Sequence, residues 1–495
     1  MSTEIELKLQ LSPKAARQLA GHPLLADLPS QRQRLLNTYF DTPELELHAR
    51  RMAVRFRKKG GQWLCTVKTA EPASGGLAMR NEWETPATPG IFDFSHVDAA
   101  ELRDYLEHHR PRLGAVFTTD FNRQTWQIPF GQSLIELAID RGHVESCGRR
   151  RPICEIELEL LSGAVDDIFG LTRQLQHDID LYPAITSKAE RGYNLFLDAP
   201  LAPFKARPAT VNAGQTLVEA FRSIALDCLE HFQRNEPGLI NGGNTEFVHQ
   251  ARVALRRLRS AIKLFAPALP SEFVATYGQA WKMLASTLGE ARNWDVFLEE
   301  TLPPIAAAFP ADRDVKRLRK AAQKRARNAR QSIAALLAVR EYPRLLLEFT
   351  AALYTLSDTQ SIALSKFAHR QIARCARKAN KLAASHSQHG PAERHRLRIA
   401  FKKLRYTLEF FAPLLPPKRL KRQLAKLSQL QDELGQINDL ATAEMFVTDV
   451  LHGRNIGLVH GWVAGRIQML VSRIEDILRN SALKTKPGQL PRLLI

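Results

Sequence analysis

Residues 4–9 read Glu-Ile-Glu-Leu-Lys-Leu, and residues 154–160 read Cys-Glu-Ile-Glu-Leu-Glu-Leu. In both segments charged and apolar side chains alternate. A period of two is typical of a β-strand, because successive side chains of a strand point to opposite faces. The alternation therefore predicts two strands, each with one apolar face and one face that carries several carboxylates.

The same alternation recurs in the first 200 residues, with charges of both signs on the polar face, at residues 54–57, 65–68, 79–84, 121–126 and 136–140. A sheet with one solvent-exposed face is the simpler interpretation, but solvent-exposed faces usually carry scattered, mixed polar residues. Here Arg and Glu dominate. We therefore expect an antiparallel barrel with a charged lumen and an apolar exterior that helices cover.

These polar faces combine clustered carboxylates with Arg and Lys. Carboxylates that lie close together raise each other's pKa and call for cations. Oxygen ligands suit hard ions such as Mg²⁺ or Mn²⁺, whereas Arg and Lys suit phosphate groups. Divalent metal, cationic side chains and phosphate together are typical of a phosphoryl-transfer site.

The charge of the chain is unevenly distributed. The net charge is +19, from 70 basic and 51 acidic residues. Residues 1–200 hold 24 basic and 27 acidic residues, so the rest holds 70 − 24 = 46 and 51 − 27 = 24, a net of +22. An excess of this size in one region indicates a polyanionic partner.

A linker separates the two regions. Residues 198–214 contain three prolines and no periodicity. We expect residues 1–197 to form the strand-rich domain and residues 215–490 an all-α domain, because apolar residues there recur with the period of a helix. The overall fold class is α+β.

The helical region contains an internal repeat with an offset of 146 residues. The segment His249-Gln-Ala-Arg-Val-Ala-Leu-Arg-Arg-Leu-Arg259 corresponds to His395-Arg-Leu-Arg-Ile-Ala-Phe-Lys-Lys-Leu-Arg405. Leu288-Gly289 and Leu434-Gly435 keep the same offset. The region is therefore predicted to consist of two copies of one helical unit.

As a set, the strand motifs of residues 1–195 resemble the CYTH domain of the triphosphate tunnel metalloenzymes. They are Glu4-x-Glu6-x-Lys8, Asn37-Thr-Tyr-Phe-Asp41, Leu137-Ala-Ile-Asp-Arg-Gly142 and Ser187-Lys-Ala-Glu-Arg-Gly-Tyr193. The resemblance implies an eight-stranded antiparallel tunnel with flanking helices and a metal-dependent enzyme that uses Mg²⁺ or Mn²⁺. Some tunnel enzymes place a tyrosine between the first two strands, but residues 9–36 contain none.

The resemblance also assigns roles to individual residues. The metal ligands it implies are Glu4, Glu6, Asp140, Glu155, Glu157 and Glu159. The substrate-binding residues are Lys8, Arg55, Arg57, Lys68, Arg80, Arg123 and Lys188. Catalytic roles fall to Glu6, Lys8, Arg55 and Arg57.

The overall pattern is most similar to bacterial inorganic triphosphatases, which implies hydrolysis of inorganic triphosphate to diphosphate and phosphate. Two alternatives remain open at this stage. One is hydrolysis of thiamine triphosphate or a nucleoside triphosphate. The other is a polyphosphate-binding protein whose tunnel binds without turnover.

Basic stripes run along the predicted helices of the second region. Side chains three and four residues apart share one face of a helix. Such stripes contain almost no acid and store repulsion that a polyanion would relieve. The residues proposed to bind polyphosphate are His249, Arg252, Arg256, Arg259, Lys263, Arg374, His395, Arg398, Lys402 and Arg405.

These helices resemble the CHAD domain, which has two related four-helix bundles and is associated with polyphosphate. The resemblance covers residues 215–490 and includes Leu288-Gly-Glu-Ala-Arg-Asn-Trp-Asp295 and Leu434-Gly-Gln-Ile-Asn-Asp439. It implies long-chain polyphosphate as a second partner. Nucleic acid is disfavoured, because the candidate helices lack aromatic residues interleaved with the basic ones for base stacking, and no recognised DNA- or RNA-binding motif occurs.

The sequence also bears on location. It begins without a signal peptide, and its longest aliphatic run, residues 333–339, is much shorter than a membrane span. Five cysteines without a Cys-x-x-Cys motif suit a reducing compartment. We expect a cytoplasmic protein, associated with polyphosphate granules and without membrane partners. No feature indicates a particular oligomeric state.

Overall fold

The computed structural model describes residues 2–69, 75–358, 360–384, 390–450 and 457–482. The chain divides into two compact units. The first comprises residues 1–202 and 339–355, and the second comprises residues 203–338 and 356–495. Each unit is described by itself.

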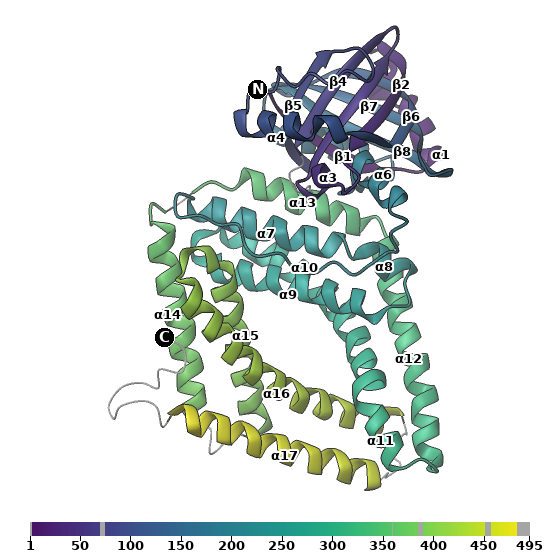
Figure 1. The fold of residues 1–495 in the computed structure, drawn as a ribbon. Coiled ribbons are helices and arrows are strands. Elements are labelled where there is room, and N and C mark those ends of the chain that lie inside the picture. The colour runs from purple at the N-terminus through teal and green to yellow at the C-terminus, as the bar shows by residue number, and fades with distance from the viewer. Residues whose placement is uncertain (1, 70–74, 359, 385–389, 451–456, 483–495) are drawn as a thin grey trace. The chain divides into compact units, whose positions relative to one another are not determined.

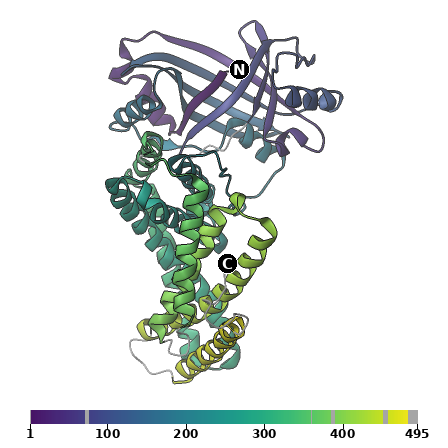
Figure 2. The same cartoon turned by 90° about the vertical axis from the view of Figure 1, so that its left-hand side faces the viewer.

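The first unit is built on a curled antiparallel sheet (Figure 2). Its strands are β1 (Ser2–Gln10), β2 (Ser30–Asp41), β3 (Met52–Lys59), β4 (Gln62–Thr69), β5 (Leu77–Pro86), β6 (Gly114–Phe130), β7 (Ser133–Ser146), β8 (Arg149–Ser162) and β9 (Tyr182–Pro183). They follow the order β5-β4-β3-β2-β6-β7-β8-β1-β9, and β1 also pairs with β5.

Strand β1 closes the sheet into a ring. Residues 2–7 of β1 pair with β5, and residues 6–10 pair with β8. The eight strands β1 to β8 therefore have no open edge between them, and β9 adds one short pairing to β1. The predicted antiparallel sheet is confirmed, with a short ninth strand that the alternation did not reveal.

Apolar faces of the strands point outwards and are covered by helices. Leu7, Leu9, Ile156 and Leu158 are fully buried in a core that also contains residues of α1 (Pro13–Ala20) and α5 (Val165–Leu175). Two smaller cores cover other parts of the sheet. Residues near these cores form α2 (Pro23–Ala26), α3 (Glu46–Ala49), α4 (Ala100–His109), η1 (Arg110–Arg112) and α6 (Lys188–Phe196).

The described part of the second unit is all helical, as predicted (Figure 1). Its elements are α7 (Leu217–Gln233), α8 (Glu236–Asn241), α9 (Thr245–Phe265), η2 (Ala266–Ala268), α10 (Ser271–Val296), η3 (Phe297–Thr301), α11 (Leu302–Ala308), α12 (Arg313–Ala338), α14 (Leu364–Ala384), α15 (Pro391–Phe410), η5 (Ala412–Leu414), α16 (Pro417–Val450) and α17 (Gly457–Ala482). Across the described helices no stretch is both long and apolar enough to cross a membrane.

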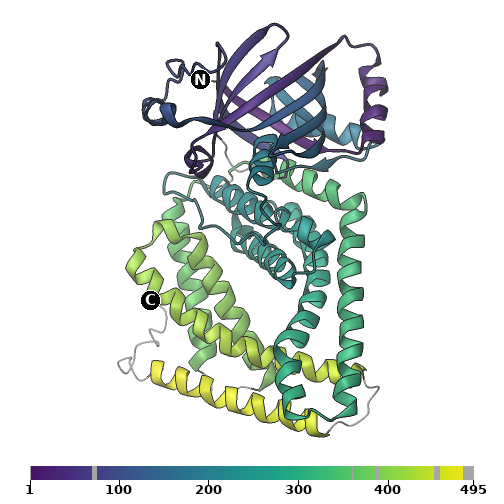
Figure 3. The same ribbon diagram turned by 45° about the vertical axis from the view of Figure 1, so that its right-hand side comes forward.

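Element boundaries within this unit keep the spacing of the sequence motifs. Helices α9 and α15 begin at residues 245 and 391, a difference of 146, and the pairs η2/η5 and α10/α16 begin with the same difference. The four helices α7, α9, α10 and α12 contact one another in chain order, and so do α14, α15, α16 and α17 (Figure 3). This spacing supports the interpretation of two copies of a four-helix unit.

Helix α13 (Glu341–Thr355) comes from the middle of the helical region but packs in the first unit. Leu347 and Ala351 are buried in the core beneath β1, β8 and α5. Arg340 Nε lies 2.7 Å from Asp180 Oδ1, and Arg344 donates a hydrogen bond to the carbonyl of Gln176. This helix therefore completes the apolar covering of the sheet.

The packing of α13 gives a test. Leu347→Ala removes a side chain that is 1% exposed, so we expect it to lower the free energy of unfolding of the first unit by about 2–5 kcal/mol. Hydrogen exchange measured by mass spectrometry should increase in β1 and β8. The exposed Glu341→Ala on the same helix serves as control. Faster exchange confined to α12 and α14 would contradict this placement of the helix.

Candidate active site in the barrel lumen

A charged cavity of about 900 Å³ lies inside the ring of strands. Each strand from β1 to β8 contributes to its wall, because the polar faces of the strands turn inwards. Seven acidic and seven basic residues line it: Glu4, Glu6, Glu82, Glu84, Glu136, Glu157 and Glu159, and Lys8, Arg55, Arg57, Lys59, Lys68, Arg123 and Lys188. The lumen is therefore lined by charges of both signs.

Three carboxylates form a row across neighbouring strands. Glu159 of β8 lies opposite Glu6 of β1 on one side and opposite Glu136 of β7 on the other. Burial, together with the charges of Glu4, Glu136 and Glu6, raises the pKa of Glu159 to about 7. Glu136 and Glu159 form no ion pair with any other described residue. This row thus carries negative charge that the protein compensates poorly.

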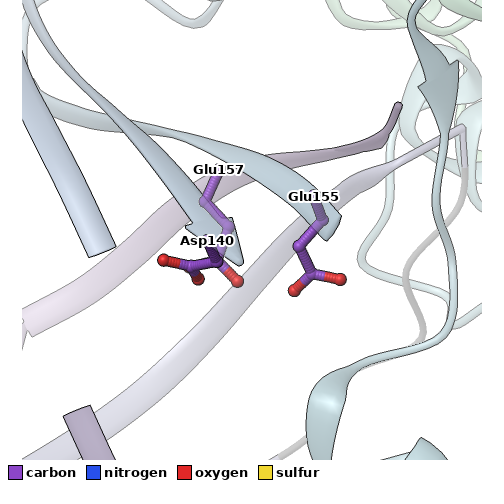
Figure 4. Close-up of side chains that lie close together, drawn as sticks. All are labelled: Asp140, Glu155 and Glu157. Carbon is purple, nitrogen blue, oxygen red and sulfur yellow. The ribbon is translucent and has the colours of Figure 1, made fainter. Parts of the chain in front are cut away.

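A second carboxylate group lies deeper in the wall. Asp140, Glu155 and Glu157 each offer an oxygen atom within 4.8 Å of the others (Figure 4). Asp140 and Glu155 are completely buried and do not line the cavity. Glu157, on the same strand face as Glu159, does line it.

This deeper group is already neutralised by cations. Arg123 donates to both oxygens of Asp140, at 2.8 and 2.7 Å, and also contacts Glu157. Lys188 Nζ lies 2.6 Å from Asp140 and 2.8 Å from Glu157. Burial by itself would raise the pKa of Glu157, but the charges of Lys188, Lys8 and Arg123 outweigh burial and hold that pKa well below its usual range. The deeper carboxylates thus position two cations at the cavity wall.

The remaining cations come from the first four strands. Lys8 Nζ lies 2.7 Å from Glu6 and 3.2 Å from Glu157. Lys68 lies 3.0 Å from Glu4 and 2.5 Å from Glu82. These contacts hold the ammonium groups inside the lumen. An anion that binds there can replace part of the contact between an ammonium group and its carboxylate.

Arg55 and Arg57 lie on β3, beside Tyr39 of β2. Arg57 Nε donates to Asn37 at 2.9 Å, and Arg55 donates to the hydroxyl of Tyr39 at 3.2 Å. Burial, followed by repulsion from Arg55 and Arg123, lowers the pKa of Arg57 to about 10. Buried cations at such close range favour an anionic ligand with several negative charges.

Most of the residues selected from the sequence meet in this lumen. Glu4, Glu6, Lys8, Arg55, Arg57, Lys68, Arg123, Glu157, Glu159 and Lys188 line the cavity. Asp140 and Glu155 lie behind its wall. The side chain of Arg80 falls outside the described part of the structure, although its backbone pairs with Glu4.

Several residues of the lumen were not selected from the sequence, among them Glu136, Tyr39, Lys59, Glu82, Glu84 and His96. Glu136 completes the carboxylate row, and its signal was the alternation of residues 136–140. Tyr39 lines the cavity and lies within Asn37-Thr-Tyr-Phe-Asp41. Burial raises the pKa of Tyr39, but Arg55, Arg57 and Lys188 more than offset this and lower it. Tyr39 lies on β2 itself, beyond residues 9–36, which contain no tyrosine.

The basic stripes of the helical unit approach one another. Arg252 and Arg256 of α9 are electrostatically coupled to Arg398 and Lys402 of α15. Burial, followed by the charges of Arg256 and Arg398, lowers the pKa of Arg252 to about 10. Burial, followed by the charges of Arg256, Arg398 and Arg252, lowers the pKa of Lys402 to about 6. Two stripes that are 146 residues apart in sequence thus form one basic cluster.

Other predicted residues lie at different places around these helices. His249 is half-buried beside Arg252 and Arg292, whereas His395 is exposed. Lys263 is coupled to Arg259, and Arg405 pairs with Glu409 at 3.1 Å. Arg374 lines a separate, mostly apolar cavity between α14 and α15.

Comparison with known proteins agrees with this architecture. The family model of the CYTH domain matches residues 2–193, and that of the CHAD domain matches residues 223–448. An inorganic triphosphatase of Haemophilus influenzae is 35% identical over 206 residues, which are 39% of this chain and 55% of that protein. The chain thus spans about half the length of this curated relative.

A solved structure is similar to the helical part. The crystal structure of the CHAD domain from the plant Ricinus communis is 32% identical, with a TM-score of 0.51, and the match covers 58% of this chain and 99% of that one. These matches and the two folds show that the chain belongs to the proteins that join a CYTH domain to a CHAD domain.

Proposed function

We propose that the lumen hydrolyses inorganic triphosphate with the help of a divalent metal ion. The observation that carries the proposal is the wall of the lumen, where seven basic residues face a row of carboxylates, two of which, Glu136 and Glu159, form no ion pair with a described residue. The similarity to an inorganic triphosphatase supports the same reaction. Thiamine triphosphate and nucleoside triphosphates are the alternative substrates.

The donor set of the lumen fits Mg²⁺ or Mn²⁺. Glu6, Glu136 and Glu159 offer oxygen ligands in adjacent positions of three strands, and such ligands suit hard cations. Glu4 lies two residues before Glu6 on β1, and Glu157 lies two residues before Glu159 on β8. Asp140 and Glu155 are better suited to hold Arg123 and Lys188. A bound divalent ion would screen phosphate charge and make water a stronger nucleophile.

The side chains of the chain have separate tasks in this proposal. Arg55, Arg57 and Arg123 bind phosphate oxygens and stabilise charge on the departing diphosphate. Lys8, Lys68 and Lys188 act as point charges along the phosphate chain. Tyr39 lies beside Arg55, where its hydroxyl can orient the substrate or exchange a proton. The closed ring of strands limits access of bulk water to the reacting phosphate.

The basic cluster of the helical unit favours a second function. We propose that Arg252, Arg256, Arg398 and Lys402 bind long-chain polyphosphate. Burial, followed by repulsion from neighbouring cations, lowers the pKa of Arg252, Arg398 and Lys402, so a polyanion that compensates the cluster should bind favourably. Asp439 is the acidic residue that acts on Arg252, Arg398 and Lys402.

Phosphate release tests the enzymatic proposal. We expect tripolyphosphate to be hydrolysed with Mg²⁺ or Mn²⁺ and not after treatment with EDTA. Glu6→Ala and Glu157→Ala should each lower turnover at least about 100-fold, because they remove charge that acts on the metal and on Lys8. The exposed Glu101→Ala is the matched control. Near-normal turnover of either variant would show that other ligands hold the metal, and faster hydrolysis of thiamine triphosphate or ATP would select an alternative substrate.

The raised pKa of Glu159 predicts how stability depends on pH. Between about 4.5 and 7 the folded metal-free protein binds more protons at this group than the unfolded chain, so the contribution of Glu159 to stability falls as pH rises. Melting temperatures measured in EDTA from pH 4.5 to 7.5 should decline more for wild type than for Glu159→Gln. Adding Mg²⁺ at pH 7.5 should raise the melting temperature of wild type more. Parallel pH curves for the two proteins would refute the uncompensated carboxylate row.

Charge reversal tests the second function. Arg252→Glu combined with Arg398→Glu should weaken polyphosphate binding at least about tenfold, and the affinity of wild type should fall steeply with added salt because counterions are released. Reversal of the exposed Arg419 and Arg422 on α16 changes the net charge equally and serves as control. Binding that is insensitive to salt, or equal losses in both double variants, would count against the cluster. Tighter binding of duplex DNA than of polyphosphate would favour the nucleic-acid alternative.

A further inference from the structure

His96 is a lumen residue that the proposed reaction does not yet use. It lies in the loop between β5 and α4, and its side chain lines the same cavity as the charged residues of the strands. Both ring nitrogens are shielded from solvent, and neither has a hydrogen-bonding partner among the described residues, so the imidazole must turn about its side-chain bonds before either nitrogen meets a ligand in the cavity. A buried polar atom without a partner costs free energy, so this arrangement calls for a ligand.

The position of His96 is fixed on both sides. Phe94 and Val97 are completely buried in the core that covers β3, β4 and β5. The backbone of Ser95 donates to Asp93, and the indole of Trp83 donates to Asp98 at 2.9 Å. Because the neighbouring residues anchor the backbone, only the imidazole itself has to move when it meets a ligand. Little conformational freedom is therefore lost.

The lining of the cavity indicates the chemistry of that ligand. Arg55, Arg57 and Lys68 share the cavity with His96 and provide positive charge for an anion. An imidazole N–H can donate to a phosphate oxygen, which is a strong acceptor. A loop histidine among such cations therefore suits an oxygen of a phosphate chain better than an apolar group.

We infer that His96 donates a hydrogen bond to the phosphate chain bound in the lumen, and that it is a substrate-binding residue contributed by a loop. The inference rests on the proposed function, because it needs a phosphate chain in this cavity. It adds a contact from the loop between β5 and α4 to the predicted ligands on the strands and to Lys188 on α6. The ligands it concerns are inorganic triphosphate and the diphosphate product.

Binding and stability measured together test the inference. Isothermal titration of the full-length protein with tripolyphosphate in EDTA separates binding from turnover. His96→Leu should raise the Kd about tenfold or more, because a hydrogen bond to a charged group is lost. His96→Asn, which keeps a donor, should stay within about threefold of wild type. His177→Leu, at an exposed position outside the cavity, is the control.

The melting temperature without ligand gives an independent readout. His96→Leu should leave it unchanged or raise it, because the variant removes buried polar atoms that lack partners. A lower melting temperature with equal loss of affinity in both His96 variants would indicate a structural role and overturn the inference. An unchanged Kd would overturn it while phosphate release by wild type still supports the proposed function. If wild type binds no tripolyphosphate in EDTA, the inference fails, whereas phosphate release with Mg²⁺ still decides the proposed function.

Discussion

Closing a sheet around charged side chains imposes one constraint on the whole first unit: charges inside the ring must be compensated there. Strand β1 creates this situation, because it pairs with β5 along one half and with β8 along the other. Its apolar residues, such as Leu7 and Leu9, then face outwards into a core, and Glu6 and Lys8 face inwards. The helices outside and the ion pairs inside both follow from that closure.

The carboxylates in and behind the lumen wall differ in how completely neighbouring cations balance their charge. Asp140 and Glu155 are paired with Arg123, Lys188 and Arg191 and hold these cations in place. Among the described residues Glu136 and Glu159 have no such partners, and burial, together with the carboxylates around it, raises the pKa of Glu159. A divalent ion would lower this repulsion, and the displaced cations are then available for phosphate. In the proposed function, one carboxylate group thus holds cationic side chains and the other would hold metal.

The helical unit carries an excess of positive charge that its own acidic residues do not balance. Its apolar stripes, for example Leu255 and Phe265 on α9, are buried as the helical period predicted. The basic faces of α9 and α15 then meet across the contact between these helices, where few acids lie. Burial of this unit's core therefore concentrates cations, and the polyanion proposed above would relieve their repulsion.

The sequence by itself determined the strand faces, the helical region and most lumen residues, because a period of two or of 3.6 fixes which side chains share a face. Ring closure, the opposition of Glu6, Glu159 and Glu136, and the meeting of Arg252 with Arg398 depend on register and packing between distant segments. The transfer of α13 to the first unit is of the same kind, since its apolar face matches a core that no local pattern reveals. Partner choice for Asp140 and the burial of His96 were likewise decided by tertiary structure, because they depend on distances between side chains that a linear pattern does not contain.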